Sequence, residues 1–453
     1  MPEERVGGDI RPGRLTPGQC AANFADLVAP LKPNEARVAA ERCLFCHDAP
    51  CVAACPTGID IPLFIRQISH GQPVAAARTI LDANIMGAMC ARVCPTENLC
   101  EGACVKETSE TRAVEIGRLQ RFATDAAFAA GKQFYSAGKP TGKAVAVVGA
   151  GPAGLACAHA LARHGHRVTI FEAKAKGGGL NEFGIAAYKA NDDIAQRELD
   201  YILAVGGISV EYGKALGRDI SLADIKKRFD AVFLGMGLGG TNDLGLGDGV
   251  SGIEDAVEFI ARLRQAADKS QLPVGRNVVV IGGGMTAIDA AVQARLIGAE
   301  QVTIAYRRSQ AEMGASAYEQ EVAQTRGVLI RPNLRPVRVE QSGGAVSGVT
   351  FEYTTSRDGA LAGTGEMVTL PADQVLVAIG QALRAEDLAG QGLALAKGRI
   401  AVDEAGKTSL PGVWAGGDCV AGGLDLTVAA VEDGKQAARS IHDFLSSSAN
   451  GKA

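Results

Sequence analysis

Eight of the eleven cysteines lie between residues 43 and 104, in two runs of four. Each run contains a Cys-Pro pair, and thiols at such spacings are typical ligands of [4Fe–4S] clusters. Proline has no backbone N–H, which suits a chain that turns away from a cluster. The spacing by itself predicts an electron-transfer segment with one cluster per run. The runs comprise Cys43, Cys46, Cys51 and Cys55, and then Cys90, Cys94, Cys100 and Cys104.

Two other uses of clustered cysteines are less consistent with this sequence. Disulfide frameworks belong to small secreted domains, whereas this chain has 453 residues and we expect no signal peptide. Structural zinc would suit the Cys-x2-Cys pair Cys43 and Cys46. Zinc knuckles usually come as two pairs, however, and here the run continues with different spacings. The pattern therefore favours iron–sulfur clusters over both alternatives.

The composition narrows the class of protein. The chain has 57 glycines, 47% hydrophobic residues and a formal net charge of −4, a balance typical of α/β nucleotide-binding folds. No run of Lys and Arg exceeds three residues, so we expect no nucleic-acid partner. The longest apolar stretch, 144–162, is interrupted by glycines and a proline, so we expect no membrane partner. Many reducible thiols indicate the cytoplasm.

Short helices are expected around the cysteines, in a small domain held together largely by its inorganic clusters. Asn34 is the expected N-cap of the helix that leads to Cys43. Residues 1–20 show no periodicity and are expected to form an extended or loosely docked arm, and the polar tail 446–453 is expected to be disordered. The other expected helices are 60–68, 73–83 and 116–130, followed by a linker at 131–142.

A dinucleotide-binding fingerprint follows the linker. An apolar strand at 143–148 leads into a glycine-rich turn, a helix and a second strand that ends in Glu172. Gly149 allows the tight turn, Gly151 allows close approach of a pyrophosphate, and Gly154 allows the helix to pack on the strand. Glu172 is placed to accept hydrogen bonds from ribose hydroxyls, which suits FAD.

A second fingerprint begins with the strand 278–281, which leads into Gly282–Ala287 and a helix. The next strand ends in Arg307 and Arg308 instead of an acidic residue. Arginine at this place accommodates a ribose 2′-phosphate, whereas NAD usually meets Asp or Glu. The residues therefore favour NADP(H), unless the arginines only form a solvated strand end.

Three further apolar strands complete the pattern. Two of them, 231–237 and 374–381, contain glycine at their ends and are suited to carry the chain between nucleotide-binding modules. The third, 413–418, ends in Asp418. This carboxylate either holds a ribityl or ribose hydroxyl or caps the helix expected over 426–444.

Together these features resemble one family from about Glu35 to Phe444. The family comprises the FAD- and NAD(P)-binding subunit of bacterial dihydropyrimidine dehydrogenase, the matching half of the animal enzyme and the small subunit of glutamate synthase. The resemblance implies an α/β chain in which an α-helical domain with two [4Fe–4S] clusters precedes two Rossmann-like domains. The implied parts are residues 1–140 (cluster domain and linker), 141–255 (first part of the FAD domain), 256–385 (inserted NAD(P) domain) and 386–453 (second part of the FAD domain and tail).

The same resemblance changes the expected cluster ligands. Gln120 stands in the sequence Ile-Gly-Arg-Leu-Gln, where dihydropyrimidine dehydrogenases have a glutamine ligand and glutamate synthase small subunits a glutamate. Cys90 becomes a spare thiol. An amide oxygen in place of a thiolate removes a negative charge and should raise that cluster's potential. The implied ligands are Cys43, Cys46, Cys51 and Cys104 for one cluster, and Cys55, Cys94, Cys100 and Gln120 for the other.

Nucleotide-binding residues are also implied by the resemblance. The FAD residues are Val93, Gly149, Gly151, Pro152, Ala153, Gly154, Glu172, Gly179, Leu180, Lys189, Gly417, Asp418 and Thr427. The NAD(P) residues are Gly282, Gly283, Gly284, Met285, Thr286, Arg307, Arg308, Ala378, Ile379 and Gly380. The chain departs from the family pattern at 184–191 and at 313–315. Bacterial members that reduce pyrimidines are often NADH-linked, so the choice between NADH and NADPH stays open.

The implied function is electron input to a partner. Hydride would pass directly from NAD(P)H to FAD, so no residue of this chain is assigned a catalytic role. The implied partner is a subunit with FMN and [4Fe–4S] clusters that reduces uracil or thymine, in a heterotetramer. The alternatives are the small subunit of glutamate synthase, a general NAD(P)H:ferredoxin oxidoreductase or bifurcating subunit, and a redox-sensing scaffold. Two intact fingerprints make the scaffold the weakest of these.

Overall fold

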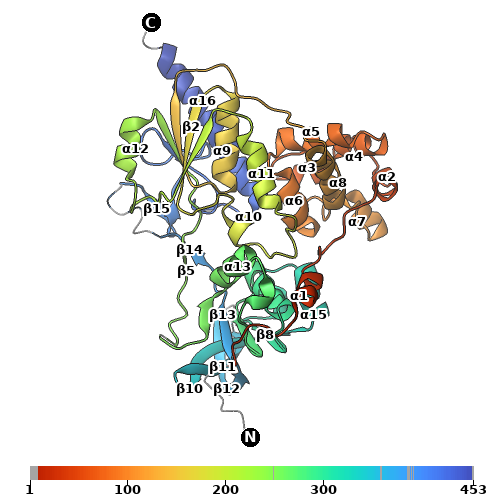
Figure 1. Cartoon of the computed structure of the whole chain (residues 1–453), viewed down its shortest axis with the longest axis vertical. Coiled ribbons are helices and arrows are strands. Elements are labelled where there is room, and N and C mark those ends of the chain that lie inside the picture. The colour runs from red at the N-terminus through yellow and green to blue at the C-terminus, as the bar shows by residue number, and fades with distance from the viewer. Residues whose placement is uncertain are drawn as a thin grey trace. The chain divides into compact units, whose positions relative to one another are not determined.

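Figure 1 shows the computed structural model, which describes residues 9–247, 249–357, 360–384, 388, 390 and 392–450. The chain forms two compact units. Unit 1 contains 1–27, 183–191 and 241–381, and unit 2 contains 28–182, 192–240 and 382–453. This division is coarser than the four expected parts, because it joins the cluster domain and both parts of the FAD domain. The finer boundaries stay predictions, and the one at 385/386 lies outside the described residues.

Unit 2 is built on a five-stranded parallel sheet in the order β17-β4-β1-β2-β3. The central strand β1 is buried at every position, as its unbroken apolar sequence requires. The strands are β1 (Ala144–Val148), β2 (Arg167–Glu172), β3 (Ile208–Tyr212), β4 (Ala231–Leu234) and β17 (Val413–Ala415).

Helices cover both faces of this sheet (Figure 1). Val145 and Val147 of β1 belong to the core formed with α9, α11 and α16, whereas Ala146 and Val148 belong to the core on the side of α12. Successive strand residues point to opposite faces, so one strand supplies both cores. The helices are α9 (Pro152–Arg163), α11 (Ile194–Leu203), α12 (Leu222–Arg228) and α16 (Thr427–Asn450).

The remainder of unit 2 is the helical segment that carries the eight clustered cysteines. It has an apolar core of its own, with Phe64, Ile65 and Leu119 fully buried, so inorganic clusters are not its only support. The expected helices are confirmed, but α2 is capped at Lys32 instead of Asn34, because Pro33 occupies its first turn. The helices are α2 (Pro33–Glu41), α3 (Pro50–Ala53), α4 (Ile61–Ser69), α5 (Pro73–Ala83), α6 (Gly87–Val93), α7 (Val105–Glu110) and α8 (Ile116–Ala129).

Unit 1 contains a second five-stranded parallel sheet, in the order β6-β13-β7-β8-β9. Three helices pack on one face and a three-stranded antiparallel sheet packs on the other. The parallel strands are β6 (Ile253–Asp255), β7 (Asn277–Ile281), β8 (Gln301–Ala305), β9 (Val328–Arg331) and β13 (Gln374–Val377). The other elements are α13 (Ala256–Gln265), α14 (Met285–Leu296), α15 (Ala317–Thr325), β10 (Leu334–Ser342), β11 (Ala345–Arg357) and β12 (Ala360–Pro371).

Both chain ends are more ordered than the sequence predicts. The expected arm contains α1 (Pro17–Asn23), capped by Thr16, and Arg11 forms a β-bridge to Val274 within unit 1. Residues 1–8 lie outside the described part. The tail prediction is wrong up to Asn450, because α16 continues to that residue. A helix that has already formed extends at little cost through residues of moderate helix propensity such as the serines here.

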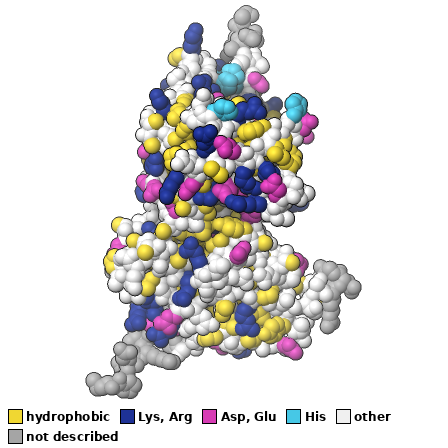
Figure 2. Space-filling model, turned by 90° about the vertical axis from the view of Figure 1, so that its right-hand side faces the viewer, with side chains coloured by type: hydrophobic (Ala, Val, Ile, Leu, Met, Phe, Trp, Pro, Cys, Tyr) yellow, Lys and Arg dark blue, Asp and Glu magenta, His cyan; other side chains and the backbone are white. Residues whose placement is uncertain are grey.

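The architecture predicted from the motifs is confirmed: a helical segment precedes two parallel-sheet nucleotide-binding folds, and the second interrupts the first. On the face shown in Figure 2, acidic and basic side chains are interspersed. Across the part of the chain that the structure describes, no helix is both long enough and apolar enough to span a membrane.

The contact between α9 and α16 depends on one glycine. A Cβ atom at Gly434 would lie 2.2 Å from the carbonyl oxygen of Ala153, so alanine would force the helices apart. We predict that Gly434→Ala lowers the free energy of unfolding by about 1–3 kcal/mol, measured by urea denaturation. Gly18→Ala in α1 is the control, because a Cβ there meets no atom within 4 Å. Equal stability of the two variants would contradict this packing.

Candidate functional site

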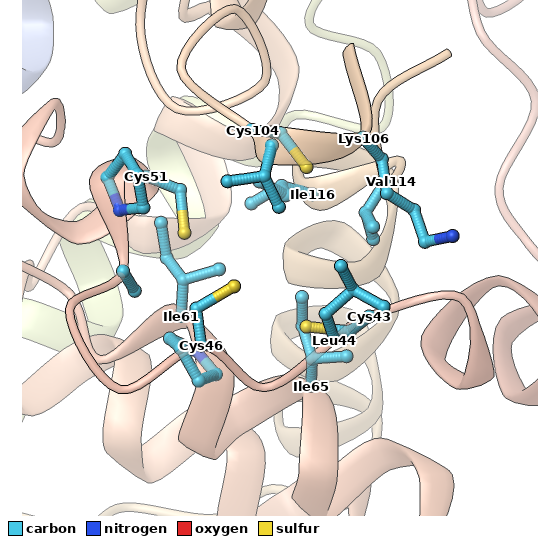
Figure 3. Close-up of a pocket in the computed structure, with 14 residues that line it drawn as sticks. Cys43, Leu44, Cys46, Cys51, Ile61, Ile65, Cys104, Lys106, Val114 and Ile116 are labelled. Atoms are coloured by element: carbon cyan, nitrogen blue, oxygen red, sulfur yellow. The ribbon is translucent and has the colours of Figure 1, made fainter. Parts of the chain in front are cut away.

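Four of the clustered thiols surround one cavity in the helical segment. Figure 3 shows the sulfur atoms of Cys43, Cys46, Cys51 and Cys104 converging on a space walled by apolar side chains. Cys43 follows α2, Cys51 lies in α3, and Cys104 precedes α7. The cavity therefore joins three thiols of the first run to the last thiol of the second run.

These thiols are crowded and partly removed from water. Burial, together with the neighbouring Cys104 and Cys43, raises the pKa of Cys51 to about 11. None of the eleven cysteines forms a disulfide. Neutral thiols can be buried at little cost, but thiolates held this close together would repel one another unless a cation neutralised them. The arrangement therefore suits a metal centre more than a dry structural core.

The kind of metal centre follows from the ligand spacing. Within the described residues, no three His, Cys, Asp or Glu side chains come close enough together to hold a single metal ion. A structural zinc ion requires four ligands at about 2.3 Å from one atom. A [4Fe–4S] cluster instead binds each thiolate through a different iron atom, so its ligands stand farther apart. The described side chains thus form no ready single-ion site, and the cluster expected from the cysteine spacing stays the prediction.

A second cavity lies beside the first and contains the other thiols. Ile61 lines both cavities, so the two spaces are separated by little more than one side chain. Val428, the second residue of α16, contributes to the wall of the second cavity. The candidate ligands around this cavity are Cys55, Cys90, Cys94, Cys100 and Gln120. The cavities thus divide the thiols as the family resemblance implies, and not by sequence run.

One hydrogen bond determines the orientation of the buried Gln120 amide. Its Nε2 donates to the carbonyl oxygen of Gly87 at 2.7 Å, and a carbonyl oxygen can only accept, so the amide cannot be reversed. The side-chain oxygen, which is the atom suited to bind iron, is left for the cavity. Cys90 also lines this cavity and is one helical turn before Cys94, so geometry alone leaves five candidate ligands.

Polar side chains join α6 to α8 and to α11 beside the second cavity. Arg92 of α6 donates to both carboxylate oxygens of Asp125 on α8, at 2.7 and 2.9 Å. Glu198 of α11 accepts from the backbone N–H groups of Ala88 and Met89, at 2.9 and 3.2 Å. Glu198 is fully buried, and burial raises its pKa from an ordinary value of 4.5 to about 8.

The first fingerprint in unit 2 has the close packing that nucleotide binding requires. Gly151 caps α9, whose N-terminus follows directly on β1. A Cβ at Gly154 would lie 2.0 Å from the carbonyl oxygen of Gly149, so only glycine allows this turn. Pro152 and Ala153 begin the first turn of the helix. Pro152 has no N–H, so Ala153 is the first of the two whose N–H can serve the expected phosphate.

Glu172 is held against the same turn. Its two carboxylate oxygens accept from the backbone N–H groups of Ala150 and Lys174, both at 2.8 Å. Each carboxylate oxygen has a second acceptor position, so the expected contact with ribose hydroxyls is compatible with these bonds.

The second part of the expected FAD domain meets the fingerprint. A Cβ at Gly417 would lie 3.0 Å from that of Ala153. Burial, with the nearby carboxylate of Asp425, raises the pKa of Asp418 to about 6. Among the described hydrogen bonds, none from the Asp418 side chain caps α16, so this structure gives no support to its alternative role as a cap.

The other expected FAD residues lie in different elements, and one of them belongs to unit 1. The hydroxyl of Thr427 donates to the side-chain oxygen of Asn181 at 2.8 Å. Asn181 belongs to α10 (Leu180–Phe183) and lies beside Gly179 and Leu180 in the chain. Val93 is the last residue of α6. Lys189 instead belongs to unit 1, where its ammonium forms ion pairs with Asp289 and Glu319, each at 2.7 Å. Its expected contact with FAD stays a prediction.

The second fingerprint lies in unit 1, between β7 and α14. Gly284 caps α14, with Met285 and Thr286 in its first turn. A Cβ at Gly283 would lie 2.5 Å from the ring of Tyr306, which packs directly on the turn.

Ala378 donates to the carbonyl oxygen of Ile281 at 2.8 Å, so the segment that contains Ile379 and Gly380 lies beside Gly282. Arg307 and Arg308 follow β8 with exposed side chains, and neither takes part in any of the described ion pairs. The expected nicotinamide-nucleotide residues are thus together at the ends of β7, β8 and β13.

Comparison with known proteins identifies the family. Residues 143–434 match the model described as pyridine nucleotide-disulphide oxidoreductase. The chain belongs to this family. Residues 20–132 match the model described as dihydropyrimidine dehydrogenase domain II, 4Fe-4S cluster. The resemblance inferred from the cysteine and glycine motifs is thereby confirmed, and the chain is an oxidoreductase of the iron–sulfur, FAD- and NAD(P)-binding type.

Two curated relatives span nearly the whole chain. The NAD-dependent dihydropyrimidine dehydrogenase subunit PreT homolog of Salmonella typhi is 37% identical over 427 residues, covering 93% of this chain and 98% of that protein. The glutamate synthase (NADPH) small chain of Escherichia coli K12 is 36% identical over 446 residues, covering 93% and 94%. Mycobacterium tuberculosis FprA in complex with NADPH has a similar fold, with a TM-score of 0.58, 19% identity, and coverage of 69% and 86%.

Sequence reasoning missed two buried polar residues near the second cavity, Asn84 and Glu198. Asn84 follows α5 and gave no distinctive pattern. Glu198 did leave a signal, because it occupies the apolar face of α11 formed by Ile194, Leu199 and Ile202. A carboxylate on an otherwise buried helix face indicates a buried hydrogen-bond partner.

Glu198 should make stability depend on pH. Because its folded pKa is raised to about 8, its favourable contribution is complete below pH 4.5 and is lost as the pH rises through 8. Glu198→Gln keeps the acceptor and cannot ionise, so we predict that it stabilises the protein at pH 9 relative to the wild type by about 4–5 kcal/mol and has little effect at pH 5.

Glu198→Leu is the matched variant, because it removes the acceptor from Ala88 and Met89. We expect it to destabilise the protein at both pH values by about 1–3 kcal/mol for each N–H left unpaired. Thermal unfolding at several pH values measures both effects. Parallel pH profiles for the wild type and Glu198→Gln would contradict the buried titration.

Proposed function

We propose that this chain is the electron-input subunit of a dihydropyrimidine dehydrogenase. It would take electrons from NAD(P)H and deliver them to a partner subunit with FMN and [4Fe–4S] clusters that reduces uracil or thymine in the cytoplasm. The proposal rests on similarity to PreT subunits along almost the full chain, on Gln120 at the second cavity, and on two intact nucleotide fingerprints.

The observation that carries the proposal is the continuity of sites within unit 2. Thr427, an expected FAD contact, is followed in α16 by Val428 in the wall of the second cavity. Asn181 accepts from Thr427 at 2.8 Å, and its Nδ2 lies 3.8 Å from the sulfur of Met86 at the start of α6. Ile61 then separates the second cavity from the first. The expected flavin site and both cavities are thus consecutive neighbours.

The bound groups would supply hydride and single-electron transfer, which protein side chains cannot perform. The residues of this chain would hold those groups and exclude water. Cys43, Cys46, Cys51 and Cys104 fit one [4Fe–4S] cluster, and Cys55, Cys94, Cys100 and Gln120 fit another. Leu44 in the wall of the first cavity has 59% of its surface exposed. Of the flavin site and the two cavities, the first cavity is thus one that reaches solvent.

The division of labour is tested with the purified holoprotein under anaerobic conditions. We predict that the chain alone uses NAD(P)H to reduce ferricyanide but does not reduce uracil, because we expect the pyrimidine site on the partner subunit. Uracil reduction should appear only with a co-purified FMN subunit. Uracil reduction by this chain alone would contradict the proposal.

The ligand assignment is tested by iron content. We predict that Cys90→Ser retains nearly the iron and sulfide of the wild type, whereas Cys55→Ser loses about four of about eight iron atoms. The reason is that Gln120, and not Cys90, would complete the second cluster. Equal iron loss in the two variants would instead support one cluster for each run of cysteines.

The nicotinamide preference is tested at the end of β8. If Arg307 and Arg308 bind a 2′-phosphate, replacing both with alanine should raise KM for NADPH about tenfold or more, with KM for NADH changed less than about twofold. Arg338→Ala is the control, because Arg338 is exposed on β10 and pairs with Glu340. Equal losses with both nucleotides would refute this role.

A second candidate is the small subunit of glutamate synthase, which the 36% identity to the Escherichia coli small chain supports. The residue at 120 favours the first candidate, since the family places glutamate there in glutamate synthase small subunits. The partner distinguishes the two functions: glutamate formation from glutamine and 2-oxoglutarate with the co-purified subunit would establish the second.

A further inference from the structure

Asn84 is a fully buried amide in the wall of the second cavity. It ends α5, and its backbone is already satisfied, because its N–H donates to Ile80 at 2.8 Å and its carbonyl oxygen accepts from Gly87 at 3.0 Å. The side-chain Nδ2 has no hydrogen-bond partner among the described residues. Buried amide donors are normally paired, so this one requires a partner that the polypeptide does not provide.

The orientation of the amide is determined by its neighbour. The side-chain oxygen of Asn84 accepts from the backbone N–H of Met86 at 3.0 Å. A backbone N–H cannot accept a hydrogen bond, so exchanging the oxygen and nitrogen of the amide would leave two donors facing each other. The NH2 group is therefore the unpaired end, and it belongs to a residue whose other polar atoms are all engaged.

Apart from the side-chain oxygens of Thr96 and Gln120, the latter expected to bind iron, the side-chain acceptors that line this cavity are sulfur atoms. The same wall contains Cys55, Cys94 and Cys100, and a cluster bound there adds inorganic sulfide. We propose that Asn84 donates an N–H···S hydrogen bond to the second [4Fe–4S] cluster and thereby raises its reduction potential. This inference rests on the proposed function, since it requires a cluster in the second cavity.

The direction of the effect follows from charge. Reduction adds one negative charge to the cluster and its sulfur atoms, so an N–H donor stabilises the reduced form more than the oxidised form. Asn84 would therefore act in the same direction as Gln120, which replaces a thiolate by a neutral ligand. Asn84 would act through a hydrogen bond and not as an iron ligand. Its replacement should therefore change the reduction potential of the second cluster without removing iron.

The test is a redox titration of the holoprotein, followed by electron paramagnetic resonance, on the wild type and Asn84→Leu. We expect the ratio of reduced to oxidised second cluster at a fixed potential to fall about tenfold, equivalent to a downward shift of about 59 mV for one electron. The first cluster serves as an internal reference whose potential should not move. Iron and sulfide contents should match those of the wild type.

Gln67→Leu is the matched control, because it removes an amide from α4 that contributes to neither cavity wall and pairs with Thr79. Asn84→Ala is the second variant, in case the leucine does not fold. Alanine has no side-chain donor, so we expect the same downward shift.

Unchanged potentials in the Asn84 variants, with two clusters present, would overturn the role of Asn84 and leave the proposed function intact. Wild-type protein with iron for only one cluster would overturn both the second cluster and this inference. A shift of the same size in Gln67→Leu would also overturn it, because the effect would then not depend on the cavity.

Discussion

The arrangement of partly buried thiols around two small cavities is the constraint on which the rest of unit 2 depends. Burial, and then the neighbouring thiols, raises the pKa of Cys51, and as thiolates these groups would repel one another. The helical segment can hold them because it has its own apolar core, and because the ion pair between Arg92 and Asp125 joins α6 to α8. Bound iron would supply the positive charge that makes the arrangement favourable.

The position of the cavities explains why one unit combines helices with a nucleotide-binding sheet. The N-terminal end of α16 contributes Thr427 toward the expected flavin residues and Val428 to the second cavity. Electron transfer requires short and fixed distances between the bound redox groups more than it requires reactive side chains. A packed helix end can hold two sites at such a distance. The other fold, in unit 1, has the features of a nicotinamide-nucleotide site, and exposed arginines follow its second strand.

The sequence predicted those features that depend on local pattern. Both fingerprints were recognisable because a buried strand, spaced glycines and a helix occur within one short stretch, and the structure has them at the expected residues. The grouping of Cys104 with the first run could not follow from spacing, because it depends on how the folded chain brings Cys104 to the first cavity; only the family resemblance implied it. The continuation of α16 to Asn450 and the location of Lys189 in unit 1 likewise depend on tertiary context. Asn84 has no signature in the sequence, since its importance lies in a donor left without a partner after folding.

The central claim is that this chain relays electrons from NAD(P)H through FAD to two clusters, and one measurement tests it most directly. NAD(P)H is added under strictly anaerobic conditions to holoprotein with measured FAD, iron and sulfide contents, and the sample is frozen for electron paramagnetic resonance. We expect the flavin absorbance to bleach and the signals of reduced [4Fe–4S] clusters to appear together. The protein should contain about eight iron atoms per chain. A contradiction would be bleaching of the flavin by NAD(P)H without any cluster signal, in protein whose two clusters dithionite reduces at a potential that NAD(P)H can reach.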